Sequence, residues 1–258
     1  VLAASIVVVG IDAFFIEPRW LAVHHVGIQS PRLEHAVRVI VVADIQTDNP
    51  GPYERRVLRR VHSEEPDLIL LAGDYVQQAD QEKYREAAQE LSRMMEEEGL
   101  DAPLGAYAVR GNVDWPGQWE RIFAGLPVTA VDQSDTMDLG PLTLTTLSLR
   151  ASSDTEVSIS SVEGFHVVMG HVPNFAKGDV EADLLIAGHT HGGQVQLPVV
   201  GPVMTLSDVP RAWASGVTEI APGKTLIVSR GIGMERGYAP RLRFLCRPQL
   251  VIVDLAPA

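Results

Sequence analysis

The chain has 258 residues, of which 46% are hydrophobic and 21% are charged, and its formal net charge is −12. This length fits one sizeable domain with its own core, and no internal repeat is visible. The acidic balance argues against broad nucleic-acid binding, which needs dense lysine and arginine, but it is compatible with a small phosphorylated substrate. The single cysteine, Cys246, excludes an intramolecular disulfide and a cysteine-based zinc cluster.

The first 16 residues, Val1–Ile16, are almost wholly apolar, with Asp12 as the one charge. Roughly 20 apolar residues are needed to cross a bilayer as a helix, so this run alone is slightly short. Two interpretations stay open. The segment is the remnant of a membrane anchor or signal peptide, which we favour, or it is a buried strand or helix. We therefore expect the domain itself to cover residues 17–258, with membrane association or export through the N-terminus.

Strand-like runs rich in valine, isoleucine and leucine recur along the chain, and they are nearly continuous, as expected for strands buried on both faces. The first five are Val37–Ala43, Leu68–Ala72, Ala106–Val109, Phe165–Met169 and Leu184–Ala187. Helical spacing of apolar residues over Tyr53–His62 and Gln81–Glu98 separates the first three runs. This alternation predicts parallel strands joined by crossover helices.

The second half contains mostly strands joined by turns. Its further strand-like runs are Met137–Leu139, Leu142–Leu147, Val195–Leu197, Leu226–Ser229 and Leu250–Leu255. Together with the first half, they predict an α/β fold class, namely a four-layer α/β/β/α sandwich of two mixed sheets flanked by helices. No linker divides the chain, so we expect one domain.

Five polar motifs directly follow strand-like runs, and each carries a side chain that can bind a metal. They are Asp44-Ile45-Gln46, Gly73-Asp74, Gly111-Asn112, Gly170-His171 and Gly188-His189-Thr190-His191-Gly192-Gly193. Most of them, taken alone, are equally typical of a turn or a helix cap. The last motif is more specific, because its glycines permit a tight turn that lets both imidazoles face one cavity. Ligand sites collect at the carboxyl ends of parallel strands, so we expect the five motifs to converge.

Together the motifs predict a site for two adjacent divalent ions. Carboxylates, an amide oxygen and imidazole nitrogens form the donor set, which consists of Asp44, Asp74, Asn112, His171, His189 and His191. Mixed nitrogen and oxygen ligands without thiolate suit Mn, Fe, Zn, Co or Ni. Two such ions, about 3.5–4 Å apart, would bind a phosphate ester and activate a water to hydroxide.

These motifs resemble those of the calcineurin-like metallophosphoesterase family, whose pattern is Asp-x-His, Gly-Asp, Gly-Asn-His-Asp/Glu, Gly-His and Gly-His-x-His. The similarity covers roughly Val37–Leu255, and the segment 188–194 is similar to the YkuE-like, membrane-associated bacterial subgroup. The resemblance implies one metal held by Asp44, Asp74 and His191, and a second held by Asp74, Asn112, His171 and His189. It also implies catalytic roles for Asn112, Asp114 and His171.

Two positions depart from the family pattern: Gln46 and Val113 stand where the family has histidine. Gln46 would still bind a metal through its amide oxygen, giving a weaker site that tolerates oxygen-preferring ions such as Mn(II). The histidine missing at Val113 is the one that the family uses to protonate the leaving group or stabilise charge near the phosphate. General acid catalysis is typically worth about 10²–10⁴-fold, so poor leaving groups should suffer most.

Two functional hypotheses follow. The first is a metal-dependent phosphoric ester hydrolase that cleaves a phosphodiester or pyrophosphate bond with a metal-activated hydroxide, on a lipid-linked or nucleotide-sugar substrate. The second is a non-catalytic metal- or phosphate-binding module on the same fold. Arg230 belongs to a cluster of arginines near the C-terminal strands and is a candidate for binding substrate phosphate. A position on a solvated face of the protein is at least equally expected for it. Nothing in the sequence indicates an oligomeric state.

Overall fold

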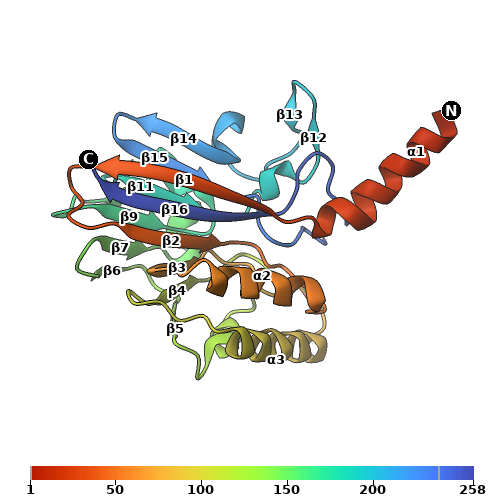
Figure 1. The fold of residues 1–258 in the computed structure, drawn as a ribbon, viewed down its shortest axis with the longest axis horizontal. Coiled ribbons are helices and arrows are strands. Elements are labelled where there is room, and N and C mark those ends of the chain that lie inside the picture. Colours follow the sequence, from red (N-terminus) through yellow and green to blue (C-terminus); the bar gives the residue numbers. More distant parts are fainter. Residues whose placement is uncertain (1, 238) are drawn as a thin grey trace.

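Two six-stranded sheets pack face to face and carry helices on their outer faces (Figure 1). The computed structural model of the chain describes residues 2–237 and 239–258. Both sheets contain parallel and antiparallel pairs. The predicted α/β sandwich of two mixed sheets is therefore confirmed.

The first sheet contains the strands that alternate with the two long helices, in the order β1-β16-β2-β3-β4-β5. β2 to β5 run parallel, β16 runs antiparallel to β2, and β1 runs parallel to β16. The strands are β1 (Ala22–Ser30), β2 (Val37–Val42), β3 (Leu68–Leu71), β4 (Ala106–Val109), β5 (Val128–Val131) and β16 (Gln249–Pro257).

The second sheet has the order β14-β15-β11-β9-β7-β6, with a parallel centre and antiparallel edge strands. Its strands are β6 (Asp135–Asp138), β7 (Thr143–Thr146), β9 (His166–Met169), β11 (Leu184–Ala187), β14 (Gly216–Ala221) and β15 (Lys224–Val228). Two small ribbons complete the strands: β8 (Ser158–Ile159) with β10 (Asp179–Val180), and β12 (Gln196–Leu197) with β13 (Gly201–Pro202).

The helices α2 (Pro52–Ser63) and α3 (Gln81–Glu98) cover the outer face of the first sheet (Figure 1). The bounds predicted for α3 are confirmed, because Asp80 caps its first turn through two backbone N–H groups and Gly99 ends it at a φ of 77°. The helical elements that follow α3 in the chain are short. They are η3 (Trp119–Phe123), α4 (Leu149–Ser153), η4 (Pro173–Lys177), η5 (His191–Gly193) and η6 (Arg211–Trp213).

Alternating side chains of the first sheet face two different core layers. In β2, Ile40 and Val42 pack towards the helices, whereas Val39 and Val41 pack towards the second sheet. A third apolar layer lies on the far side of the second sheet, where Phe175 of η4 packs. Burial on both faces explains why these strands are continuous apolar runs.

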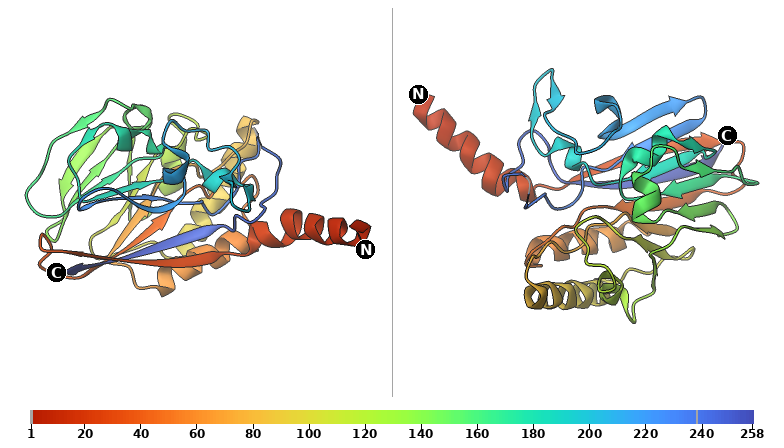
Figure 2. Two further views of the ribbon diagram at one scale, coloured as in Figure 1. Left: turned by 90° about the horizontal axis from the view of Figure 1, so that it is seen from above. Right: turned by 180° about the vertical axis from the view of Figure 1, so that it is seen from behind.

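The N-terminal helix α1 (Leu2–Ile11) projects away from the sheets (Figures 1 and 2). It continues through a π-helical turn, η1 (Asp12–Ile16), and a 3-10 turn, η2 (Glu17–Arg19), into β1. Ile6 is 64% exposed and Phe15 is 67% exposed, so the alternative of a segment buried in the core is wrong for these residues. No helix in the described part of the chain is long and apolar enough to span a membrane.

Candidate metal centre

The seven predicted metal ligands, which comprise two aspartates, three histidines and two amides, lie at the carboxyl ends of five strands from both sheets. Asp44 and Gln46 follow β2, Asp74 follows β3, Asn112 follows β4, His171 follows β9, and His189 and His191 follow β11. Two groups bring ligand atoms within 4.8 Å of one another: Asp74 with His171 and His189, and Asp44 with Asp74 and His191. Asp74 belongs to both groups, as a bridging ligand would.

In the group around Asn112, three lone-pair atoms converge. Asn112 Oδ1 lies 2.9 Å from His171 Nε2 and 2.7 Å from His189 Nδ1. The opposite ring nitrogens lie near backbone oxygens: His171 Nδ1 is 2.8 Å from Ala72 O, and His189 Nε2 is 2.9 Å from Leu206 O. If each ring donates its N–H to that carbonyl, the inward nitrogens are bare acceptors beside an amide oxygen. Such a set needs a proton or a cation at its centre.

In the group around Asp44, three buried atoms have no hydrogen-bond partner in the described structure: Asp44 Oδ2, Gln46 Oε1 and His191 Nδ1. An unpaired buried acceptor costs about 1–3 kcal/mol, so three in one region call for a compensating positive group. Carboxylate and amide oxygens with an imidazole nitrogen are ligands that divalent transition metals accept. The residues therefore fit a metal ion.

The amide of Gln46 is held in one orientation by two residues that sequence reasoning missed. Gln46 Nε2 donates to Gln77 Oε1 at 3.1 Å and to Glu235 Oε2 at 2.9 Å. Gln77 Nε2 also donates to Glu235 Oε1, at 2.9 Å, so the three side chains form one network. Because the nitrogen is fully engaged, the oxygen of Gln46 is left as the free acceptor, as its predicted role as a ligand requires. No local motif marks Glu235, which is 189 residues away in the chain.

We expect Gln46→Ala to lower the affinity for one of two bound Mn(II) ions by about 10–100-fold, because one ligand and its oriented amide are lost. Titration of the metal-free protein with Mn(II) measures both affinities. Gln78→Ala is the matched control, since Gln78 Nε2 donates to the carbonyl of Asp48. Unchanged binding of two ions by Gln46→Ala would show that Gln46 is not a ligand.

The loops that carry the ligands are strained. Five of the candidate residues have left-handed backbone: φ is 49° at Asp44, 37° at Gln46, 58° at Asp74, 69° at His189 and 49° at His191. Each such conformation costs of order 1–3 kcal/mol and persists only where the surrounding structure imposes it, typically at functional sites. The loops also pack tightly. A Cβ at Gly111 would lie 2.0 Å from Asp74 Oδ1, so only glycine fits there.

Asp114 holds two of these loops together. Its Oδ2 accepts from the backbone N–H of Asp74 at 2.9 Å and of Gly111 at 2.8 Å, and its Oδ1 accepts from that of Tyr75 at 2.8 Å. The carboxylate is buried, and all its described contacts are to these amides. This geometry makes Asp114 a positioning residue, and the catalytic role that the resemblance implies for it stays a prediction.

Asp114→Asn should lower the free energy of unfolding by about 2–4 kcal/mol, because an amide NH₂ would then face backbone N–H donors. Urea denaturation measures the change. Asp138→Asn serves as the control, since Asp138 accepts a single N–H, from Gly140, at an exposed turn and should cost less than about 0.5 kcal/mol. Equal effects in the two variants would contradict the positioning role.

Burial and neighbouring charges shift the pKa values of the candidate ligands in different directions. Burial raises the pKa of Asp44 to about 7. Burial alone would lower the pKa of His171, but the carboxylates of Asp74 and Asp44 raise it to about 9. Burial and the Arg243 guanidinium hold the pKa of His191 well below its usual value. His171 Nε2 lies 3.3 Å from Asp74 Oδ2, so in the metal-free protein a proton holds that pair.

Arg230 packs against Gly192 of the last motif, where a built Cβ would lie 2.7 Å from Arg230 Cγ, and it faces a separate cavity. It lines a cavity of about 400 Å³ together with Trp20, His24 and Arg247, and its NH2 lies 3.0 Å from His24 Nε2. Its predicted contact with substrate phosphate therefore stays a prediction. Arg243, a nearby arginine in the chain, is fully buried and donates to the backbone oxygens of Gly233 and Cys246, so it is a structural residue.

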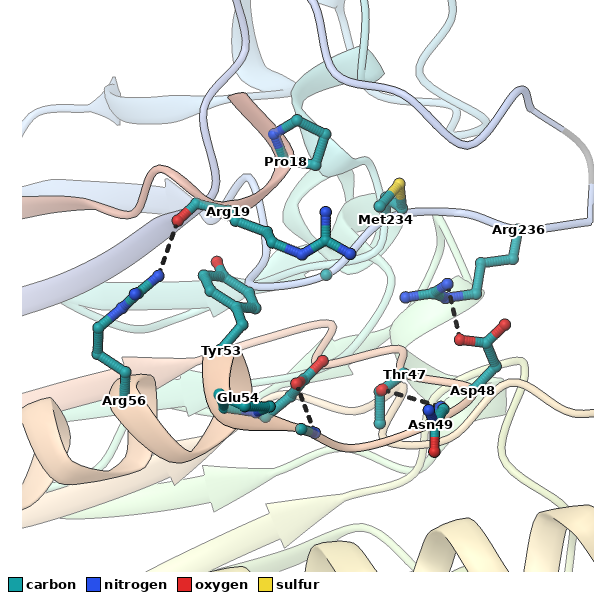
Figure 3. A pocket seen from close by; sticks show the side chains of 13 residues that line it. Pro18, Arg19, Thr47, Asp48, Asn49, Tyr53, Glu54, Arg56, Met234 and Arg236 are labelled. Atoms are coloured by element: carbon teal, nitrogen blue, oxygen red, sulfur yellow. Dashed lines mark hydrogen bonds and ion pairs between the residues drawn. The ribbon is translucent and has the colours of Figure 1, made fainter. Parts of the chain in front are cut away.

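A second cavity, of about 470 Å³, is lined by Thr47, Asp48 and Asn49, which directly follow Gln46 in the chain (Figure 3). Arg19 and Arg236 extend into it from opposite sides, and Tyr53 lies next to Arg19 (Figure 3). Arg236 is tied to the loop, because its Nε donates to the backbone oxygen of Gln46 at 2.7 Å and its NH1 pairs with Asp48 Oδ1 at 2.9 Å. This arginine thus supports the metal-ligand loop from outside.

Comparison with known proteins identifies the family. The sequence profile of the calcineurin-like phosphoesterases matches residues 37–193. The uncharacterized metallophosphoesterase YkuE of Bacillus subtilis is 27% identical over 264 residues, covering 94% of this chain and 88% of the relative. The phosphodiesterase YaeI of Escherichia coli is 28% identical over 205 residues, covering 74% and 71%. The UDP-2,3-diacylglucosamine pyrophosphatase LpxG of Chlamydia muridarum is 23% identical over 325 residues, covering 98% and 94%. The profile spans more than half of the chain and ends within the last of the five motifs, so the chain belongs to the calcineurin-like phosphoesterase family.

Proposed function

We propose that this protein is a two-metal hydrolase that cleaves a phosphodiester or pyrophosphate bond in a lipid-linked or nucleotide-sugar substrate. The observation that carries the proposal is the place of Asp74 in both ligand groups, with unpaired acceptor atoms around it. The relatives support the reaction class, since one is named a phosphodiesterase and another a pyrophosphatase of a diacylated nucleotide sugar.

The divalent ions, when bound, supply Lewis acidity that attracts phosphate oxygens and lowers the pKa of water. The chain itself supplies orientation. Asp74 Oδ1 accepts the backbone N–H of Val113 at 2.9 Å, which fixes the carboxylate between the two groups. Asn112 Oδ1 lies between His171 and His189, and both rings are anchored at backbone oxygens. These contacts fix the ligand atoms before any ion arrives, which favours catalysis by preorganisation.

The side chain at position 113 sets the expected leaving groups. Val113 keeps the backbone contact to Asp74 but offers no titratable proton next to the site. A leaving group of low pKa, such as an aryl oxide or the phosphate of a pyrophosphate, departs without protonation, whereas a simple alkoxide does not. We therefore propose that alkyl phosphates are poor substrates.

Turnover of an aryl phosphodiester, a nucleotide-sugar pyrophosphate and an alkyl phosphate, each with Mn(II), tests this proposal. We expect the alkyl ester to be slowest, and Val113→His to accelerate it by about 10²-fold while changing the other two little. Val113→Gln is the control, because glutamine is polar and of similar size to histidine but is not an acid. Fastest cleavage of the alkyl ester by the unaltered protein would refute the proposal.

The absence of the histidine at Val113 also favours one alternative, a module on this fold that binds metal or phosphate without turnover. Metal analysis with activity assays separates the two. Two equivalents of metal per chain without hydrolysis of any of the three substrates, across Mn, Zn, Co and Ni, would support the binding module. We also propose that the protein associates with a membrane through residues 1–16, as the apolar, exposed side chains of α1 suggest.

A further inference from the structure

Exposed apolar side chains gather at one end of the molecule. Among the described side chains, every large hydrophobic residue that is exposed, except Val217, lies in residues 6–20, in residues 197–206 or at Leu245. Monomeric soluble proteins seldom expose apolar side chains in such concentration unless they contact a partner or a membrane. The segment 196–206, which contains β12 and β13, is here called the hairpin.

The hairpin and α1 start from the same place. The backbone N–H of Arg243 donates to Ala13 O, at the root of α1, at 2.9 Å. The next residue, Phe244, accepts from the backbone N–H of Gln196, at the root of the hairpin, also at 2.9 Å. One short segment therefore joins the two roots, and both elements project from the same end of the molecule (Figures 1 and 2).

The hairpin also borders the metal centre. Leu206 O lies 2.9 Å from His189 Nε2, and a Cβ built on Gly193 would lie 2.5 Å from Pro202. The exposed surface of the hairpin is apolar. Its exposed side chains are Leu197, Val199, Val200, Val203, Met204 and Leu206. An element that borders the candidate metal centre thus exposes six large apolar side chains.

A lipid bilayer fits this end better than a protein partner does. Residues 6–9 of α1 are all exposed and apolar, so the helix is apolar on every side over this turn. A helix that binds a protein partner through one apolar stripe would have a polar opposite face. Trp20 lies at its base with the Arg247 guanidinium 4.1 Å above the ring, and tryptophan and arginine are enriched where a membrane meets water. From Leu2 to Ile16 the helix is about 22 Å long, enough to enter the roughly 30 Å hydrocarbon layer deeply.

We propose that the hairpin is a second membrane-contact element, which with α1 seats the opening of the metal centre on a phospholipid bilayer. The phosphate of a lipid-linked substrate would then reach the ligands without leaving the headgroup layer, while its acyl chains stay in the membrane. This inference rests on the proposed function and deepens it by naming an amphiphilic substrate presented at a lipid surface.

Fluorescence at single introduced cysteines tests the contact. Cys246 is fully buried, so Val203→Cys and Val217→Cys can each be labelled with an environment-sensitive fluorophore. Val203 and Val217 are both 51% exposed, which makes the second a matched control. On vesicles of phosphatidylcholine with phosphatidylglycerol, we expect the label at position 203 to shift to the blue and to be quenched by lipids with acyl-chain quenchers, and the label at position 217 to stay unchanged.

Binding gives an independent measurement. Val203→Glu should weaken vesicle affinity by about tenfold, the loss expected when one valine side chain no longer enters an apolar phase, whereas Val217→Glu should not. Thermal unfolding checks that both variants fold. An unshifted label at position 203 on vesicle-bound protein would overturn the inference. A blue shift that appears without vesicles, when the chain forms a dimer, would also overturn it. Hydrolysis of the soluble aryl diester, measured in parallel, reports separately on the proposed function.

Discussion

Asp74→Asn should abolish binding of both metal ions and reduce hydrolysis of the aryl diester by more than about 100-fold. Loss of an outer-shell partner typically costs 10–100-fold in metal affinity or activity, and the loss of a shared anionic ligand should exceed that. Asp74 provides ligand atoms to both groups, and it is one of only two carboxylates in them. Asparagine keeps the shape and the oxygen that accepts the N–H of Val113.

Asp44→Asn provides the matched comparison, because Asp44 belongs to one group alone. We expect this variant to lose one ion and to retain the second, held by Asp74, His171 and His189. Metal analysis after dialysis against Mn(II) distinguishes the two variants. Retention of one tightly bound ion by Asp74→Asn, at the affinity of the unaltered protein, would show that Asp74 is not shared.

Metal affinity should rise steeply with pH and release protons on binding. In the metal-free protein the neighbouring carboxylates raise the pKa of His171 to about 9, so below that pH its imidazole carries a proton that the metal must displace. The expected fall in affinity is about tenfold for each pH unit below pH 9. Burial raises the pKa of Asp44 to about 7, so below pH 7 a second proton competes and the fall becomes steeper.

Calorimetric titration of the metal-free protein with Mn(II) in buffers of different ionisation enthalpy measures the released protons directly. We expect about one proton per chain near pH 8 and more at pH 6. His171→Asn is the control, because it keeps a polar ligand but removes the raised imidazole pKa, and the pH dependence above pH 7 should flatten. A pH-independent affinity between pH 6 and pH 9 would contradict this account.

The fold was predictable from sequence where burial on two faces leaves continuous apolar runs. β4 and β11 have the predicted bounds, and α3 is marked by Asp80 and Gly99 at its ends. β1 was missed, because this edge strand mixes apolar residues with exposed polar ones such as His24 and His25. Half-exposed edge strands carry little periodic signal, and their pairing partner, here β16, is far away in the sequence.

The ligands of the candidate site were predictable from the sequence, but the residues that hold these ligands in position were not. Local motifs after strands marked Asp44, Asp74 and the histidines, because the carboxyl ends of strands are where such sites form. The orientation of Gln46 depends on Glu235, a contact that only the folded chain creates. Asp114 resembles a family residue in sequence, but only coordinates show that backbone amides occupy both of its oxygens.

The position of β16 has a consequence for the order of folding. The segment Gln249–Pro257 lies between β1 and β2 although it follows both of them far along the chain, so the first sheet stays split until this segment has joined it. β1 can pair with nothing else in that sheet before then, and it stays an unpaired edge. Closure of this sheet is therefore a long-range folding step, and removing residues 249–258 should leave β1 and β2 without the strand that joins them.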